Sequence, residues 1–415
     1  IAIIGVGYVG LPLAKSLSKY YNVNAFDTNN LRIKELKKGI DRNLEFKKKE
    51  LLNQNLKFTN LFIEIKNCNV FIITLPTPIN KKRIPDISLV IKATSNLAKI
   101  IKKKDLIIYE STFYPGTIED ELIPILEKNS KLKYNKDFFI GYSPERISPG
   151  EKVHTLEKVK KVIASNNISS LKQVRDIYKK IIKAGIYEAS SIKVAELSKI
   201  IENTQRFVNI SLMNELSILC NKLNIQTKEV IDAASSKWNF VKYFPGFIGG
   251  HCVAVDPLYF SFKQKKLKIK SYLVDAADKI NETKHLEVIN QLKIKLSNLR
   301  NKKILILGAT FKENCPDLRN SGVIKLLESL NKKKAKLFIH DPFIKKNRLK
   351  NETKSKFVTL NRLQSSDYDC VIIAVAHSYY KKIGLDKIKK ISSKKSCLFF
   401  DLKSIFSKDK VDFQL

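Results

Sequence analysis

Short apolar runs alternate with amphipathic stretches from the beginning of the chain, which is the pattern of strands connected by helices. The pattern predicts strands at 1–4, 23–26, 70–75, 106–109, 138–141 and 162–164, and helices at 11–19 and 88–103. Strands connected in this way pair in parallel and need helices over both faces of the sheet. Residues 1–188 are therefore expected to form a parallel-sheet α/β domain.

A helical section follows. Residues 192–224 contain no Gly or Pro and predict one long helix, and helical segments continue to about residue 298. The Gly-rich stretch at 245–250 is the exception. A helical section between two α/β halves usually spaces domains or pairs subunits. We expect 189–298 to be a central domain through which the chain forms a homodimer.

A second α/β unit is predicted for 299–415. A strand within 302–311 leads to Gly308, and a strand at 337–339 ends before Asp341. A helix at 323–330 and strands at 371–375 and 397–400 complete the pattern. This unit lacks a Gly-x-Gly-x-x-Gly motif, so we do not assign it a dinucleotide. The predicted fold is α/β, with two Rossmann-like parallel-sheet domains joined by a long central helix and a helical dimerisation domain.

Composition narrows the function classes. The 415 residues exceed one ordinary core, and no apolar run approaches the ~18 residues of a membrane span. The net charge of +37 invites a nucleic-acid interpretation. Lysine is spread over many helices, however, and no zinc-finger or RNP pattern accompanies it. We expect neither a nucleic-acid nor a membrane partner, and a positive field that attracts anionic substrates.

Cysteine and histidine usage argues against metal and disulfide chemistry. The six Cys form no Cys-x-x-Cys pair, and the five His show no ligand-like spacing. We expect no metal and a reducing, cytoplasmic location. The chain begins at Ile1, without Met and inside an expected strand, so the true start is expected to lie upstream, and the opening strand argues against a leader.

A dinucleotide motif opens the chain. Gly5, Gly7 and Gly10 join a predicted strand to a helix, and Asp27 ends the next strand. The glycines permit a tight turn and close approach of a pyrophosphate to the helix N-terminus. Asp27 can accept hydrogen bonds from the adenosine ribose and would repel a 2′-phosphate, which favours NAD over NADP. Arg32 leaves the alternative open, because a nearby Arg can pair with that phosphate.

A second motif, GFIGGHCVAVDPLYF, covers 246–260. It places the Cys252 thiol after two glycines and His251, with the Asp256 carboxylate four residues on. An ionised thiol can attack a carbonyl, although a lone Cys is usually a buried structural residue. His251 can be catalytic or can anchor the backbone. A nicotinamide site together with a nucleophilic Cys suggests oxidation of an aldehyde through a thioester.

Polar residues on the long helix are open to two interpretations. Lys199, Asn203 and Arg206 share one helix face, where they form either a functional group or a solvated stripe. Loops after predicted strands add candidates, because ligands bind at the carboxyl ends of parallel strands. These loops are 77–78, 111–112 and 142–146, and together they outline one crevice.

Seven motifs in order resemble the nucleotide-sugar 6-dehydrogenase family, which includes UDP-glucose and UDP-ManNAc dehydrogenases, along essentially the whole chain. They are GVGYVG at 5–10, LPTP at 75–78, ESTFYPGT at 110–117, SPER at 143–146, ELSKIIENTQR at 196–206, GGHCVAVDP at 249–257 and FKENCPDLRNS at 311–321. The resemblance implies an N-terminal Rossmann domain, a helical dimerising middle and a C-terminal domain that holds UDP. It also implies oxidation of a sugar C6 alcohol to a carboxylate with two NAD.

The resemblance assigns roles to single residues. It implies that Cys252 is the nucleophile, that Lys199 and Asn203 stabilise oxygen charge, that Asp256 and Thr112 organise water, and that Glu145 assists hydrolysis. The NAD positions, besides the three glycines, are Tyr8, Val9, Asp27, Arg32, Thr77, Thr112 and Arg319. The substrate positions are Glu145, Arg146, Ile147, Lys199, Asn203, Arg206, Gly249, Cys252, Phe311 and Lys312.

Two motifs indicate a branch of the family. Pro-Glu-Arg at 144–146 and His251 before the Cys resemble enzymes that oxidise UDP-N-acetylhexosamines, and SSKWNF at 235–240 is similar to the UDP-GlcNAc and UDP-GalNAc 6-dehydrogenases of surface-polysaccharide pathways. Phe244 departs from the Arg that often stands there, which leaves the choice of hexosamine open. The alternatives are a UDP-ManNAc or UDP-glucose dehydrogenase, a two-electron hydroxyacid dehydrogenase that uses Lys199, and a basic nucleotide- or RNA-binding protein.

Overall fold

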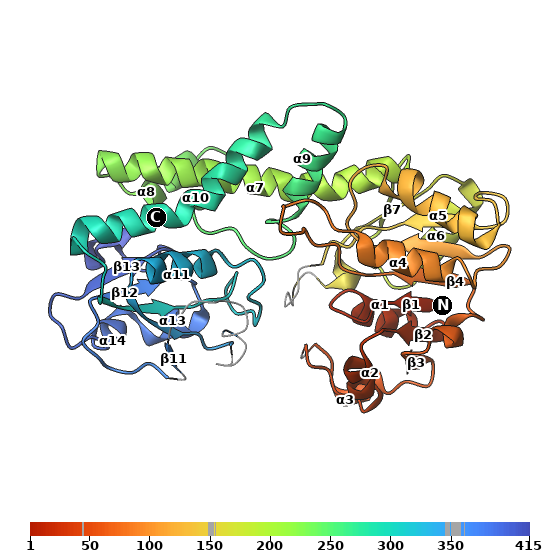
Figure 1. The fold of residues 1–415 in the computed structure, drawn as a ribbon, viewed down its shortest axis with the longest axis horizontal. Helices are drawn as coiled ribbons and strands as arrows, with labels where there is room; N and C mark the ends of the chain where they lie inside the picture. Colours follow the sequence, from red (N-terminus) through yellow and green to blue (C-terminus); the bar gives the residue numbers. More distant parts are fainter. Residues whose placement is uncertain (44, 148–152, 154, 345–348, 350–357, 361) are drawn as a thin grey trace. The chain divides into compact units, whose positions relative to one another are not determined.

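The computed structural model describes residues 1–415 except 44, 148–152, 154, 345–348, 350–357 and 361. The chain forms two compact units (Figure 1). Unit 1 comprises Ile1–Glu202 and Leu258–Ile269, and unit 2 comprises Asn203–Pro257 and Lys270–Leu415. The helical section is thus divided between the units, and the three-domain boundaries stay a prediction.

An eight-stranded sheet in the order β3-β2-β1-β4-β5-β6-β7-β8 forms the centre of unit 1. The order reverses between β1 and β4, as in dinucleotide-binding folds. The strands are β1 Ala2–Ile4, β2 Val23–Phe26, β3 Leu56–Thr59, β4 Val70–Ile73, β5 Leu106–Tyr109, β6 Phe139–Tyr142, β7 Lys161–Ser165 and β8 Ile186–Glu188. β1 to β6 are parallel, which confirms the predicted sheet, but β7 runs antiparallel to β6. The described part of their connection holds only the short η3 (Leu156–Lys158), too little for a helical crossover.

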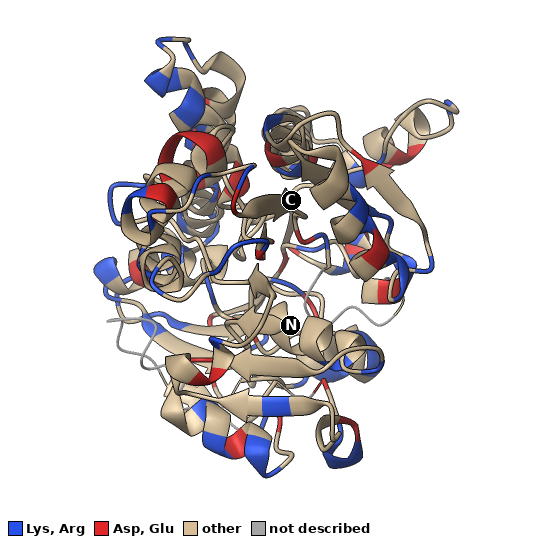
Figure 2. Cartoon of the chain, turned by 90° about the vertical axis from the view of Figure 1, so that its right-hand side faces the viewer, with Lys and Arg blue, Asp and Glu red and all other residues tan. Residues whose placement is uncertain are grey.

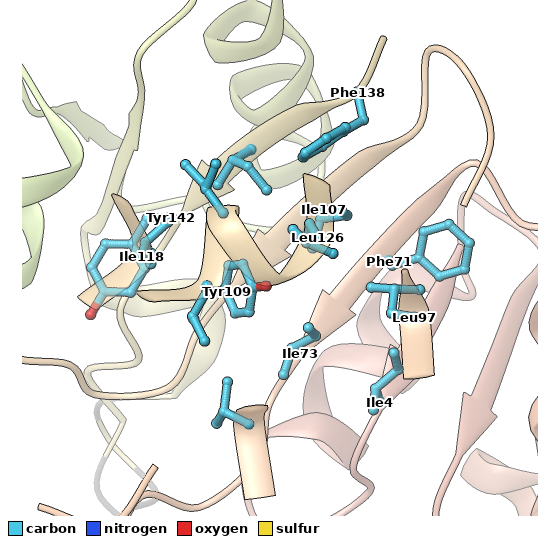
Figure 3. Close-up of a cluster of buried hydrophobic side chains, with 14 of the residues drawn as sticks. Ile4, Phe71, Ile73, Leu97, Ile107, Tyr109, Ile118, Leu126, Phe138 and Tyr142 are labelled. Carbon is cyan, nitrogen blue, oxygen red and sulfur yellow. The ribbon is translucent and has the colours of Figure 1, made fainter. Parts of the chain in front are cut away.

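Helices cover both faces of this sheet. Alternate strand residues point to opposite faces, so Ile4, Ile73 and Ile107 join one core and their neighbours join the other. Figure 3 shows the first core, in which Leu97 of α4 and Leu126 of α5 pack on strand residues. The helices of unit 1 are α1 Gly10–Leu17, α2 Asn30–Lys37, α3 Lys48–Leu51, η1 Phe62–Ile65, α4 Ser88–Leu97, η2 Ile118–Leu122, α5 Ile123–Ser130 and α6 Ile168–Lys179.

The predicted long helix is present as α7 (Ile192–Leu223), which continues from unit 1 into unit 2 (Figure 1). In unit 2 it pairs with α10 (Tyr272–Leu296) through a buried polar layer, where Asn281 Nδ2 donates to Ser211 Oγ at 2.7 Å. α8 (Thr227–Ala234) follows α7, and α9 (Asp256–Lys266) precedes α10. No helix in the described part of the chain is long and apolar enough to cross a membrane.

Unit 2 contains a second sheet, parallel throughout, in the order β11-β10-β9-β12-β13-β14. α10 and α11 pack on one face, and α13 and α14 pack on the other. The remaining elements are β9 Lys303–Leu307, α11 Gly322–Lys332, β10 Lys336–His340, β11 Val358–Leu360, β12 Cys370–Ile373, α13 Ser378–Ile383, α14 Leu385–Lys389, β13 Leu398–Asp401, η4 Lys408–Lys410 and β14 Phe413–Gln414. The strand order again reverses beside the first strand, between β9 and β12.

Basic residues are dispersed. Figure 2 shows Lys and Arg on helices, strands and loops, with Asp and Glu among them. The net charge of +37 is therefore spread over many elements.

Candidate active site

The glycine motif forms the turn between β1 and α1 in unit 1. Gly5 has φ +98°, and a Cβ on Gly10 would lie 1.8 Å from the Gly5 carbonyl oxygen, so both positions require glycine. A Cβ on Gly7 would meet nothing within 4 Å. The open space beside Gly7 and the N-terminus of α1 fit the pyrophosphate of a dinucleotide. Tyr8 and Val9 lie half-buried in the same turn.

Asp27 and Arg32 flank this turn. Asp27 follows β2, and its carboxylate accepts the backbone N–H groups of Val6 (2.9 Å) and Asn29 (2.8 Å). Arg32 is buried, with Nη1 2.9 Å from Asp41 Oδ1 and Nε donating to the Val6 carbonyl. Asp41 thus neutralises the Arg32 guanidinium, which in the sequence was a candidate partner for the 2′-phosphate of NADP. The arrangement fits NAD better than NADP.

Hydrogen bonds connect the predicted loops at the carboxyl edge of β4, β5 and β6. Ser111 Oγ donates to the Leu75 carbonyl (2.6 Å), and Thr77 Oγ1 donates to the Thr112 carbonyl (2.9 Å). The Tyr142 hydroxyl donates to the Ser111 carbonyl (3.1 Å). The structure therefore brings the three loops together, as the strand ends predicted.

Glu145 follows β6 in this group. Its Oε1 accepts the backbone N–H groups of Arg146 and Ile147, both at 2.6 Å, and its Oε2 lies 2.9 Å from Lys161 Nζ. Burial raises the pKa of the Glu145 carboxyl, but Lys161 and the backbone donors outweigh burial and hold that pKa below its ordinary value. Arg146 pairs with Glu202 of α7 at 2.7 Å.

The polar face of α7 is not a uniform solvated stripe. Lys199, in unit 1, is only 7% exposed. Asn203, in unit 2, is half-buried and donates from Nδ2 to Asp256 Oδ2 at 2.6 Å. Arg206 is exposed. The surface interpretation is therefore wrong for Lys199, whose burial needs another explanation.

The cysteine loop is held tightly in unit 2. Asn214 on α7 pairs with both backbone groups of Gly246, at 2.8 and 3.1 Å. A Cβ on Gly249 would lie 2.7 Å from the Asn320 carbonyl oxygen, and the Gly250 N–H donates to the Arg319 carbonyl at 3.0 Å. The loop thus packs against the 311–321 motif, far from it in sequence.

Cys252 lies directly after this contact. It is half-buried, whereas the other five cysteines are buried. Its carbonyl accepts the N–H of Asp256 at 2.8 Å, which places the thiol one turn before α9. The His251 side chain remains without an assigned role.

A small, partly open cavity lies at the carboxyl ends of β9 and β12, where the strand order reverses. Ligands bind at this point in open parallel sheets. The predicted Phe311 and Lys312 line it, together with Phe247, Thr310 and Lys403. Arg319 lies outside the lining and pairs with Asp317 at 2.5 Å.

Sequence reasoning missed Lys403 and Lys161. Lys403 comes two residues after β13, so its place after a predicted strand was an available signal. Lys161 stands in a lysine-rich stretch, and its contact with Glu145 is visible only once β7 is known to run antiparallel.

Three family models match consecutive parts of the chain. They are the NAD binding domain of the UDP-glucose/GDP-mannose dehydrogenase family at residues 1–182, its central domain at 193–283 and its UDP binding domain at 305–408. The NAD-binding match contains the glycine turn, and the UDP-binding match contains most of the cavity lining.

Full-length relatives agree with these matches. UDP-N-acetyl-D-glucosamine 6-dehydrogenase of Salmonella typhi is 43% identical and covers 100% of this chain and 98% of that protein. The Pseudomonas aeruginosa protein of the same name is 41% identical and covers 100% of this chain and 99% of that protein. The structure of UDP-D-ManNAc dehydrogenase from Pyrococcus horikoshii is 26% identical, with a TM-score of 0.87, and covers 100% of this chain and 98% of that one. The chain therefore belongs to the UDP-glucose/GDP-mannose dehydrogenase family and is an oxidoreductase that uses NAD and acts on a UDP-sugar.

Proposed function

We propose that the chain oxidises the C6 hydroxyl of a UDP-N-acetylhexosamine, UDP-GlcNAc or UDP-GalNAc, to the uronic acid in surface-polysaccharide biosynthesis. The observation that carries the four-electron reaction is Cys252, a half-buried thiol in a loop fixed by Gly249 and Gly250. Full-length relatives named UDP-N-acetyl-D-glucosamine 6-dehydrogenase, 43% and 41% identical, support the N-acetylhexosamine.

The residues proposed to hold NAD can bind its phosphates and its ribose. The glycine turn offers backbone N–H groups to phosphates, and Asp27 offers a carboxylate to the ribose. When bound, NAD accepts one hydride in each of the two oxidations. The proposed contacts are Gly5, Gly7, Tyr8, Val9, Gly10, Asp27, Arg32, Thr77, Thr112 and Arg319.

Cys252 supplies the covalent step. Its thiolate adds to the C6 aldehyde carbon and forms a thiohemiacetal, whose oxidation leaves a thioester. The Lys199 ammonium and the Asn203 amide donate hydrogen bonds to the oxygen that gains negative charge at C6. The bond from Asn203 to Asp256 fixes the amide and leaves its second N–H available for that oxygen.

Water then releases the acid. Thr112 and Asp256 orient a water molecule, and its oxygen adds to the thioester carbonyl while one proton passes to Glu145. The C–S bond breaks, the thiolate leaves with the bonding pair, and the carboxylic acid loses its remaining proton to solvent. Glu145 suits this role because Lys161 and two backbone donors keep it ionised near neutral pH.

The UDP part of the nucleotide sugar is proposed to bind at the cavity of unit 2. The cavity at β9 and β12 has lysines 312 and 403 in its wall, which suits the two phosphates of UDP. The proposed substrate contacts are Glu145, Arg146, Ile147, Lys199, Asn203, Arg206, Gly249, Cys252, Phe311 and Lys312.

A panel of UDP-sugars with NAD tests the proposal. We expect two NADH per molecule of UDP-GlcNAc or UDP-GalNAc, a UDP-uronic acid as product and no released aldehyde. UDP-ManNAc and UDP-glucose serve as matched alternatives. A higher kcat/KM for either of them would contradict the proposed sugar, and one NADH per sugar would favour a two-electron enzyme that needs no thiol.

A further inference from the structure

A buried cluster of four ionisable side chains lies at the carboxyl edge of the unit 1 sheet. Lys161 Nζ lies 3.0 Å from Glu110 Oε2 and 2.9 Å from Glu145 Oε2. The Tyr178 hydroxyl donates to the other oxygen of Glu110, and Lys161 Nζ lies 5.4 Å from the centre of the Tyr178 ring. We call these residues the lysine cluster.

The direction of β7 creates the cluster. Glu110 follows β5 and Glu145 follows β6, so both lie where these parallel strands end. Because β7 runs antiparallel to β6, its first residue, Lys161, begins at that same edge. Tyr178 comes from α6, which packs on β7. Four separate elements thus place one cation between two carboxylates.

The environment makes Lys161 the main counterion of Glu145. The Lys161 side chain is 3% exposed and that of Glu110 is fully buried, so water screens their charges little. Burial raises the pKa of Glu110 to about 7, despite Lys161. Among the described residues, Arg146 beside Glu145 is itself paired with Glu202 of α7. Lys161 is thus the cation that, together with two backbone N–H donors, keeps Glu145 ionised.

We propose that Lys161, held by Glu110 and Tyr178, is a positioning residue that orients the Glu145 carboxylate toward the water that releases the acid. The inference rests on the proposed role of Glu145. Two backbone N–H groups hold Oε1, and Lys161 holds Oε2, so the carboxylate has one orientation and keeps a lone pair for the water proton. Lys161 itself transfers no proton.

The test separates hydride transfer from acid release in rapid-mixing and quench experiments. In Lys161→Met we expect a normal burst of two NADH per active site and acid release slowed about 10- to 100-fold. The low-pH limb of acid release should move up by about one pH unit, because removing the cation raises the pKa of Glu145. Lys161→Arg should restore most of the rate. Lys158→Met, which removes an exposed lysine nearby, is the matched control.

A double variant keeps the test valid if Lys161→Met does not fold. Glu110→Leu with Lys161→Met replaces the buried pair with apolar side chains and leaves no unpaired charge at Glu110. It should show the same slow acid release and the same shift of the pH limb. A wild-type rate and pH limb in this folded variant would overturn the inference.

Glu145→Gln tests the proposed role of Glu145 separately from that of Lys161. If Lys161 acts through Glu145, Glu145→Gln with Lys161→Met should release acid as slowly as Glu145→Gln alone. Additive losses would overturn the inference and leave the proposed role of Glu145 standing. Acid release at the wild-type rate in Glu145→Gln would instead refute that role, and the inference with it.

Discussion

At the scale of single residues, two of the proposed catalytic side chains depart from the usual burial of their residue type. Five cysteines are buried, an environment in which thiols react poorly, while Cys252 is half-buried in a loop that glycines fix. Lys199 is buried although lysine is among the residues least often buried. Both departures occur in motifs to which the family resemblance gives a role in the reaction, so they motivate the first two predictions.

Replacing Cys252 with Ser should abolish acid formation and leave binding of NAD and UDP-sugar intact. Ser keeps the shape of the side chain, but its hydroxyl is a far weaker nucleophile than a thiolate. NADH yield, acid production and ligand affinity measure the result. Iodoacetamide should label Cys252 in the wild type before the five buried cysteines, and UDP-sugar should protect it. Acid formation by Cys252→Ser at the wild-type rate would refute the covalent role.

Replacing Lys199 with Ala should lower kcat by roughly 10²–10³, the usual loss for one donor to a developing oxyanion. NAD affinity should barely change, because the glycine turn and Asp27 remain. Lys193→Ala removes an exposed lysine from the same helix and should keep normal kcat. Near-normal kcat in Lys199→Ala would show that its burial serves packing alone.

At the scale of elements, periodicity predicted the parallel strands and the long helix, because β1, β4, β5 and α7 have strong apolar patterns. It missed β3 and β8, whose burial alternates or is incomplete. It also missed the reversal at β7, since an apolar run does not indicate its direction. The lysine cluster depends on that reversal, so no local pattern could have revealed it.

The glycine and cysteine motif could be predicted from the sequence, but the segment that packs against it could not. Gly249 and Cys252 stand out in the sequence because glycines and a thiol are uncommon in this lysine-rich chain. The segment that packs on Gly249 and Gly250, residues 311–321, lies about sixty residues further along the chain, and its sequence does not indicate this contact. The chemistry of the loop was therefore predictable from local sequence. The contact that holds the loop in place, with a segment distant in sequence, became visible only in the folded structure.

Replacing Gly249 with Ala tests the contact between the cysteine loop and residues 311–321. The new Cβ would lie 2.7 Å from the Asn320 carbonyl oxygen and 2.9 Å from Phe311 Cβ, so the loop must move. We expect kcat to fall by about 10², the typical cost of displacing a reacting group by about 1 Å, with NAD binding unchanged. Gly384→Ala is a comparison variant that creates no steric contact. Gly384 has φ +80°, but a Cβ there would meet nothing within 4 Å. Full activity in a folded Gly249→Ala variant would show that the loop contact is dispensable.

At the scale of the whole molecule, the proposed functional residues are divided between the two units. Unit 1 contains the NAD-binding match and Glu145, and unit 2 contains Cys252 and the UDP-binding match. Both substrates are anions, and the net charge of +37 gives the whole chain a field that attracts them. Lys and Arg lie on many elements, so this attraction does not depend on a single site (Figure 2).

The proposed homodimer rests on α7. In unit 2, Leu212, Leu219 and Leu223 are each more than half exposed and recur at spacings that place them on one helix face. An exposed apolar stripe of this kind is typical of a subunit interface. Leu219→Glu should therefore weaken the dimer, because burying an unpaired carboxylate in an apolar contact is costly.

Light scattering after size-exclusion chromatography, over a range of protein concentrations, measures the shift toward monomer. Ile168→Glu, at an apolar residue 89% exposed on α6, is the matched control and should leave the dimer intact. A wild type that is monomeric at all concentrations, or a Leu219→Glu variant that dimerises like the wild type, would place the interface elsewhere or remove it.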